Sequence, residues 1–172
     1  LDKYHFSFKK TIELIKFCKK IKIKFLSSPF DELSFEFLKK NKLNLIKVPS
    51  GEITNYQLIK EMTKFKRKII LSTGMSTLKE VNDTLSFLIN HGVPKNDITI
   101  LHCNTEYPTP MQDVNLNVLK TFQKKFKTKF GYSDHTSGIE VSIAASALGA
   151  SIIEKHFTLD KKMNGPDHKA SL

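Results

Sequence analysis

The sequence predicts an α/β protein in which parallel strands alternate with helices along the whole chain. Short apolar runs rich in β-branched residues recur through all 172 residues. Their starts lie about 20–30 residues apart, which is the length of one βα unit. The runs are almost continuously apolar, as strands buried on both faces must be. The six predicted strands are residues 23–28, 45–50, 69–73, 98–104, 129–133 and 151–156.

The segments between these runs have the apolar periodicity of amphipathic helices. The clearest N-terminus is at Thr77, because Glu80 follows three residues later and completes a capping-box pattern. In the first of these segments, Leu33, Phe37 and Leu38 are expected to form the buried face. The five predicted helices are residues 32–40, 56–65, 77–91, 116–126 and 139–148.

Two architectures are built from such units, an open doubly wound sheet and a (β/α)8 barrel. An open sheet usually carries a glycine-rich phosphate loop after its first strand, and none follows residues 23–28. Every predicted strand instead ends in polar residues, as in the rim of a barrel, where catalytic groups gather. We therefore expect residues 1–172 to be a single domain, an incomplete (β/α)8 TIM barrel. About six βα units are present, and the first two strands are missing.

The composition excludes several classes of protein. The net charge is +11, but Arg67 is the sole arginine among 28 basic residues, and the lysines are spread out, mostly on helical segments such as residues 9–20. Arginine is the residue preferred for phosphate and base contacts, so we expect solvated helix faces and no nucleic-acid partner. No apolar stretch is long enough to span a membrane, so no membrane partner is expected. The two cysteines, Cys18 and Cys103, suit a reducing compartment, and we expect the cytoplasm.

Several strand ends carry residues that could act in catalysis or binding, and each of these residues also has a simpler structural interpretation. Glu52 follows the second run, where it either serves a site or belongs to a helix-capping loop with Asn55. Ser72 precedes hydroxyl and glycine residues that would form an anion cradle or only a cap and turn. Residues 102–110 bring together imidazole, amide, hydroxyl, carboxylate and phenol groups. Cys103 in that run is expected to pack as a small apolar residue rather than to act as a nucleophile.

The strongest candidates for metal ligands are His135 and His156, which lie at or just past the ends of two consecutive predicted strands. Neighbouring parallel strands lie about 5 Å apart, so both imidazoles could bind one divalent ion. The simpler alternative is two hydrogen-bonded structural histidines. Lys155 offers a rival chemistry, a Schiff base as in barrel aldolases. Strand alternation places Lys155 and His156 on opposite faces, so they cannot both face the interior of the barrel.

Seven segments, taken in order, resemble the catalytic barrel of the N-acetylneuraminate (sialic acid) synthase family, which includes the legionaminic and pseudaminic acid synthases. They are FLSSPFD (25–31), KVPSGE (47–52), LSTGM (71–75), LHCNTEYPTP (101–110), GYSDHT (131–136), EKHFTLD (154–160) and GPDHKASL (165–172). They cover almost the whole chain from about residue 23 onwards. One position departs from the family pattern, since Thr105 stands where an asparagine is frequent and Asn104 precedes it.

The resemblance implies a condensation of phosphoenolpyruvate with an N-acylated amino sugar in its open-chain aldehyde form. The sugar would be N-acetylmannosamine or a 2,4-diacetamido-trideoxyhexose, and the products a nine-carbon α-keto sugar acid and phosphate. A divalent Mn²⁺ or Mg²⁺ ion would assist. Carried over by motif, the metal ligands are His135 and His156, the phosphoenolpyruvate contacts are Lys47, Ser50, Ser72 and Ser133, the carboxylate near the reacting centre is Glu52, and the sugar-side residues are Asn104, Thr105, Tyr107 and Asp167.

The resemblance also implies segments beyond this sequence, namely the first two strands and a small C-terminal antifreeze-like domain. The full-length protein is expected to be a homodimer. Without the missing strands, two apolar strand edges would lack partners, so this segment alone is expected to be inactive and poorly soluble. Two alternatives stay open: a Schiff-base barrel aldolase that uses Lys155, and a truncated, non-catalytic basic module.

We predict that the native gene product is much heavier than the 19.7 kDa of these residues. The expected excess corresponds to about 70 residues upstream, which complete the roughly 250 residues of a barrel, and to a C-terminal domain. Mass spectrometry of the intact natural protein measures this. A mass close to that of the present chain would instead support the non-catalytic alternative.

Overall fold

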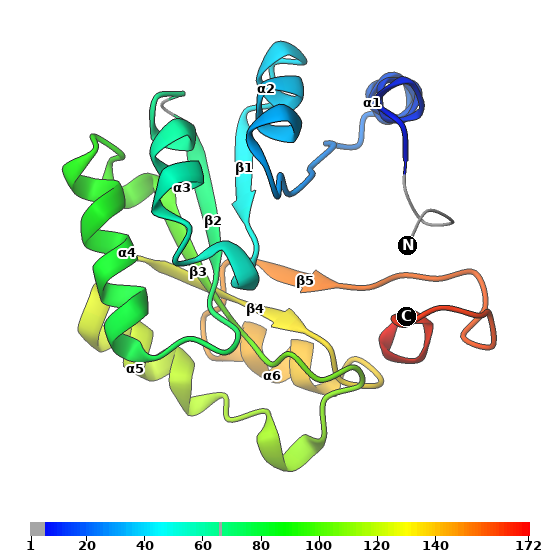
Figure 1. Ribbon diagram of the computed structural model, residues 1–172. Coiled ribbons are helices and arrows are strands. Elements are labelled where there is room, and N and C mark those ends of the chain that lie inside the picture. Colours follow the sequence, from blue (N-terminus) through cyan, green and yellow to red (C-terminus); the bar gives the residue numbers. More distant parts are fainter. Residues whose placement is uncertain (1–5, 66) are drawn as a thin grey trace.

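The computed structural model describes residues 6–65 and 67–172 and shows an α/β fold (Figure 1). Five strands form one sheet in the order β1-β2-β3-β4-β5, and each neighbouring pair is parallel. The predicted α/β class with parallel strands is thus confirmed. The strands are β1 (Leu45–Val48), β2 (Lys68–Ser72), β3 (Ile98–Cys103), β4 (Lys129–Asp134) and β5 (Ile153–Lys155).

Several of the helices begin at residues whose side chains cap them. Thr77 accepts a hydrogen bond from the backbone of Glu80, and the Glu80 carboxylate accepts one in return, which completes the predicted capping box. Asp31 and Asn55 cap two further helices in the same manner. The helices are α1 (Phe8–Lys20), α2 (Glu32–Lys40), α3 (Tyr56–Thr63), α4 (Leu78–Asn90), α5 (Asn117–Phe126) and α6 (Glu140–Ala147). Among the described residues, none of these helices is both long and apolar enough to cross a membrane.

The strand order distinguishes the two architectures. A doubly wound sheet reverses its strand order and covers both faces with helices. Here the order follows the chain, and right-handed crossovers then place the connecting helices on one face. Figure 1 shows α3, α4, α5 and α6 along the outer side of a strongly twisted sheet. The five strands therefore form a parallel half-barrel.

The predicted strand at residues 23–28 is wrong, and the described part of the chain contains five strands rather than six. These residues are extended, but no described backbone hydrogen bond joins residues 24–28 to β1. The physical reason is that an apolar, β-rich run indicates a fit to the surface of a sheet but does not by itself determine hydrogen-bond pairing with a neighbouring strand.

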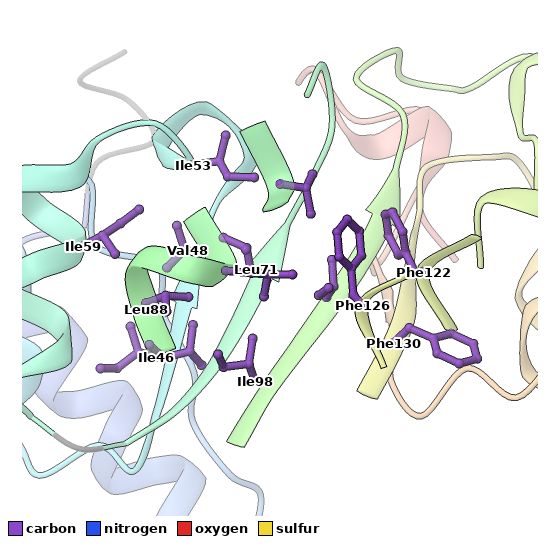
Figure 2. Close-up of a cluster of buried hydrophobic side chains, with 14 of the residues drawn as sticks. Ile46, Val48, Ile53, Ile59, Leu71, Leu88, Ile98, Phe122, Phe126 and Phe130 are labelled. Carbon is purple, nitrogen blue, oxygen red and sulfur yellow. The ribbon is translucent and has the colours of Figure 1, made fainter. Parts of the chain in front are cut away.

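The core lies between the outer face of the sheet and helices α3, α4 and α5 (Figure 2). Alternate strand residues such as Ile46, Val48 and Leu71 point outwards and pack against Ile59 and Leu88 of the helices. These side chains are almost completely buried. The opposite residues of the same strands face the inside of the half-barrel, where the polar groups described below are found.

One predicted helix face is partly wrong. In α2 the buried residues are Phe35 and Leu38, whereas Leu33 is exposed. Positions 35 and 38 are three apart and share a face in a helix, as do 33 and 37, so periodicity alone gives two possible faces. The structure selects the face that contacts the core, where the Phe35 ring meets Phe65 edge to face.

Gly131 of β4 is predicted to be required for tight packing between β4 and the chain that leads into β5. A Cβ at this position would lie 2.4 Å from the Ile152 carbonyl oxygen and 2.6 Å from Leu101 Cδ2. Gly131→Ala should therefore lower the free energy of unfolding by about 1–3 kcal/mol. Urea denaturation of the full-length protein measures this. Gly51→Ala is the control, because a Cβ there meets nothing within 4 Å; equal losses in both variants would contradict the packing argument.

His102 is predicted to make stability depend on pH. It lies on the outer face of β3 under Phe122 and Tyr132, with Nε2 2.8 Å from the Val114 carbonyl oxygen. Burial lowers the pKa of His102, against the opposing effect of the Val114 hydrogen bond. The folded state thus binds a proton less readily than the unfolded chain, whose histidine pKa is about 6.5. Its contribution to stability is complete above about pH 6.5 and is lost as the pH falls from there towards the folded-state pKa.

The measurement is the urea midpoint between pH 8 and pH 5 for the wild type and for His102→Gln. The variant should show a smaller fall in midpoint, although some remains because burial also lowers the pKa of His135. His91→Gln, at the exposed end of α4, is the matched control and should retain the wild-type fall. Identical pH profiles for wild type and His102→Gln would show that His102 does not contribute.

Candidate functional site

A polar cleft of about 470 Å³ lies at the carboxyl ends of the strands, on the inner face of the half-barrel. Each strand or the loop after it contributes side chains, as expected for the catalytic end of a barrel. The cleft residues that the sequence predicted are Lys47, Ser50, Ser72, Asn104, Thr105, Tyr107, Ser133, His135 and His156. The others are Ser28, Pro49, Gly51, Met75, Cys103, Glu154 and Lys155.

Strand alternation explains why these residues meet. Lys47 lies between the outward-facing Ile46 and Val48, so its side chain points into the half-barrel. Ser72 and Ser133 take the corresponding inner positions near the ends of β2 and β4. The strands are parallel and in sequential order, so these inner positions form one continuous surface.

An ion pair crosses this surface from the first strand to the last. Lys47 Nζ lies 3.0 Å from Glu154 Oε1, and the same oxygen accepts a hydrogen bond of 2.7 Å from Ser133 Oγ. In a flat sheet, β1 and β5 would be about 19 Å apart, which these side chains could not span. Burial alone would raise the pKa of Glu154, but the charge of Lys47 and the hydrogen bonds from Ser133 and Lys47 outweigh it and lower the pKa. Glu154 is therefore held as a carboxylate.

The two histidines face each other, with ring centroids 5.5 Å apart. His135 Nδ1 lies 2.6 Å from the Asn104 carbonyl oxygen, which only accepts, so Nδ1 carries the proton and Nε2 has a free lone pair. Ser133 Oγ lies 3.3 Å from that Nε2, but its hydrogen is donated to Glu154. Burial lowers the pKa of His135, only partly opposed by the Asn104 contact, and this favours the neutral ring.

Tyr107 covers the histidines. Its ring stacks on His135 at 4.0 Å between centroids and meets His156 edge to face at 5.6 Å. Burial raises the pKa of Tyr107 to about 12. The phenol thus stays protonated at neutral pH and presents an O–H donor beside the two imidazoles.

Two polar atoms of the cleft have no partner within the described part of the chain. Ser72 Oγ and Asn104 Oδ1 are both buried without a hydrogen bond. Ser50 Oγ, by contrast, accepts a hydrogen bond from Gly74 N at 3.0 Å and lies 3.3 Å from Cys103 Sγ. Buried polar groups are rarely left unsatisfied. The free oxygens at positions 72 and 104 are therefore suited to bind a ligand.

Two predicted site residues are not in the lining of the cleft. Glu52 lies in the short 3₁₀ turn after β1, where its Oε2 accepts a hydrogen bond of 2.7 Å from Asn55. Asp167 Oδ2 lies 3.9 Å from His156 Nδ1, so it is next to the histidine pair although outside the lining. Sequence reasoning did not assign Glu154, although the residue lies two positions before His156 on the same face of β5.

Lys155 does not present its amine to the cleft. Its Nζ donates a hydrogen bond of 2.7 Å to the Thr136 carbonyl oxygen and lies 3.2 Å from Asp134 Oδ2. Alternation along the strand thus places the Lys155 ammonium group and the His156 ring on opposite faces of the sheet, as predicted. A Schiff base needs a free amine at the substrate, and this geometry argues against the aldolase alternative.

The histidine pair fits a divalent cation. His135 has the arrangement usual for a metal-binding histidine, because a carbonyl holds the proton on Nδ1 and leaves Nε2 free. His156 Nδ1 lies 3.9 Å from Asp167 Oδ2, beyond hydrogen-bond distance. Among residues 6–65 and 67–172, no group of three or more His, Cys, Asp or Glu side chains is arranged to bind a metal. A cation held here would therefore take its other ligands from water and substrate.

Comparison with known proteins gives consistent results. The NeuB family model matches residues 1–172. The N,N'-diacetyllegionaminic acid synthase of Campylobacter jejuni is 54% identical over 93% of this chain and 48% of its own length. The enzyme of the same name from Legionella pneumophila is 43% identical over 87% of this chain and 43% of its own length. The chain thus spans about half the length of the curated relatives that it matches.

A solved structure gives the same picture. The crystal structure of the N-acetylneuraminic acid (sialic acid) synthetase from Leptospira borgpetersenii, in complex with citrate, superposes with a TM-score of 0.92 at 33% identity. The match covers 98% of this chain and 58% of that one. A 3-deoxy-D-arabino-heptulosonate 7-phosphate synthase from Thermotoga maritima superposes with a TM-score of 0.83 at 18% identity, which supports the fold alone.

Proposed function

This chain belongs to the NeuB family, and on that premise we propose that it forms most of the catalytic barrel of a sialic-acid-synthase-type enzyme. The proposed reaction condenses phosphoenolpyruvate with an N-acylated amino sugar and releases phosphate. The observation that carries the proposal is the inner cleft, where Lys47, Glu154, Tyr107 and the two histidines converge from separate strands and loops.

The anionic substrate would bind on the β1–β2 side of the cleft. Lys47 supplies the cation, Ser50 and Ser72 supply hydroxyl groups from the same side, and Ser133 supplies another from β4. Ser72 Oγ is buried and has no described partner, so a phosphate or carboxylate oxygen would satisfy it. Charge-assisted hydrogen bonds of this type orient phosphate groups strongly. These residues would hold phosphoenolpyruvate with its enol carbon directed towards the histidines.

His135 and His156 are the residues that would hold Mn²⁺ or Mg²⁺. A divalent ion bound there would act as a Lewis acid towards the aldehyde oxygen of the sugar. The chain's own residues orient the partners. Tyr107 offers a phenol O–H beside the imidazoles, while Asn104, Thr105 and Asp167 lie in or near this part of the site. Glu52 is proposed to act near the sugar, which would require its carboxylate to leave Asn55.

The proposed reaction forms one carbon–carbon bond and breaks the bond to phosphate. The terminal enol carbon of phosphoenolpyruvate forms a bond to the aldehyde carbon, whose oxygen becomes a hydroxyl group on taking a proton. Water adds to the carbon that bears the phosphate, and phosphate leaves to give the keto acid. Fixed hydroxyl, amide and ammonium groups favour this sequence by orienting two substrates that would otherwise have to meet in solution.

The two curated relatives described above favour a 2,4-diacetamido-trideoxyhexose as the sugar, with N-acetylmannosamine second. Both are named as legionaminic acid synthases, at 54% and 43% identity. We further propose a homodimer for the full-length protein. We propose the cytoplasm as its compartment, because Cys18 and Cys103 are both free thiols.

We predict that His135→Ala and His156→Ala each weaken Mn²⁺ binding by more than about 100-fold. The loss of a direct metal ligand should reduce affinity at least as much as the loss of a residue that only hydrogen-bonds to a ligand. Isothermal titration of the full-length protein measures the affinity. A second assay measures the phosphate release that requires both phosphoenolpyruvate and sugar. In both variants this release should fall in parallel with the affinity for Mn²⁺.

His91→Ala is the control, because His91 lies at the exposed end of α4, outside the cleft. Wild-type metal binding and phosphate release in both histidine variants would overturn the proposed function. Such a result would favour the non-catalytic basic module, which salt-sensitive DNA binding would test directly.

A further inference from the structure

Behind the two histidines, on the outer face of the sheet, lies a buried ion pair. Asp134, the last residue of β4, is completely buried, and the Lys155 side chain is 6% exposed. Asp134 Oδ2 lies 3.2 Å from Lys155 Nζ. The substrate-binding groups proposed above do not include either charge.

Every charge of this pair is matched by hydrogen bonds. Asp134 Oδ1 accepts from Thr136 N at 2.8 Å and from Thr136 Oγ1 at 2.7 Å, while Oδ2 accepts from Ser142 Oγ of α6 at 2.5 Å. Lys155 Nζ donates to the Thr136 carbonyl oxygen at 2.7 Å. The pair thus joins β4, β5, the loop after β4 and the helix α6.

The position of the pair relative to the histidines is fixed by register. Asp134 and Lys155 are directly opposite each other in the parallel ladder. The next residue along each strand is His135 or His156, on the opposite face because strand side chains alternate. The imidazole pair thus follows directly after Asp134 and Lys155, the last pair of the ladder; the ion pair faces α6 and the imidazoles face the cleft.

β5 is short, so side chains on both of its faces hold its register: Glu154 accepts a hydrogen bond from Ser133, its partner in the ladder, and Lys155 pairs with Asp134. The strand contains three residues, Ile153–Lys155, pairs with β4 alone among the described strands, and has no fully buried side chain. A slip of one residue would turn His156 away from the cleft. Buried ion pairs add little net stability, because desolvation offsets their attraction, but their geometry is directional. This pair is therefore suited to fix a register rather than to add stability.

We propose that Asp134 and Lys155 are positioning residues that hold His135 and His156 at the separation needed to share one divalent cation. The inference rests on the proposed metal-binding role of the two histidines. It assigns a function to the charged residue that precedes each histidine, and it makes the outer face of β4 and β5 part of the site.

The test uses the full-length protein, with Mn²⁺ as the probe and two variants. Lys155→Met removes the ammonium group but keeps most of the side-chain volume. Asp134→Asn/Lys155→Met also removes the carboxylate charge, so that no unpaired charge remains buried. Isothermal titration gives the Mn²⁺ affinity, thermal unfolding gives stability, and the electron paramagnetic resonance spectrum of bound Mn²⁺ reports its ligand geometry.

We expect Lys155→Met to bind Mn²⁺ about 10–100-fold more weakly, which is the usual effect of losing support for a metal ligand, and to give an altered Mn²⁺ spectrum. The double variant should recover thermal stability but not affinity, since the link from β5 to Thr136 is still missing. The double variant also keeps the test decisive if the Lys155→Met protein does not fold. Leu88→Ala, a core change in α4 outside the cleft, is the control and should lower stability with unchanged Mn²⁺ affinity.

Wild-type affinity and spectrum in the double variant would overturn the positioning role and leave the pair a structural contact. If His135→Ala and His156→Ala abolish binding in the same series, the metal site stands and only the positioning role fails. If those histidine variants bind Mn²⁺ like the wild type, the proposed metal site is wrong and the positioning role is overturned with it.

Discussion

The ion pair between Lys47 and Glu154 can form only because the sheet is curved, and it is therefore evidence of that curvature. The two residues are in the first and last of five strands, yet their charged atoms are 3.0 Å apart. That contact is possible only if the strands bend round a common axis, because a flat sheet would separate them by about 19 Å. The same curvature brings the strand ends together into one cleft. A Lys–Glu pair of this kind adds little to stability, since Glu154 is partly exposed, so its main consequence is the arrangement of the cleft.

Alternation along each strand separates two chemistries across a single layer of backbone. Outward residues such as Val48, Leu71 and Ile100 form the core with the helices, while inward residues near the strand ends, such as Lys47, Ser72 and Ser133, are polar groups of the cleft. The outer layer is not uniformly apolar, and two of its polar side chains have clear partners, whereas the Tyr132 hydroxyl is buried without one in the described part of the chain. His102 contacts the Val114 carbonyl oxygen, and Asp134 is matched by Lys155 and hydroxyl groups. The outer layer of β4 and β5 thereby supports the histidines that its own strands carry.

The sequence was sufficient for the parallel sheet, the capped helices and most of the cleft, because those features follow from local periodicity and from the rule that parallel strands end at one edge. It could not decide whether Leu33 or Phe35 faces the core, since both choices satisfy helical spacing and only tertiary contact distinguishes them. It wrongly predicted a strand at residues 23–28, because a β-rich composition indicates a fit to the surface of a sheet but does not encode hydrogen-bond pairing with β1. Glu154 was not assigned, because its significance lies in a partner 107 residues away, and no local pattern encodes that pairing.

The charges of the cleft constrain how an anion could enter it. Lys47 is already paired with Glu154, and the lowered pKa of Glu154 keeps that carboxylate ionised at neutral pH. A phosphorylated substrate that binds Lys47 must therefore share the ammonium group with Glu154 or displace it. Ser133 donates to the same carboxylate oxygen, so displacement would also free the Ser133 hydroxyl, which lies 3.3 Å from His135 Nε2. Arrival of an anion at β1 would thus change the hydrogen bonding next to the histidine pair at β4. The two halves of the proposed substrate site are coupled through one glutamate.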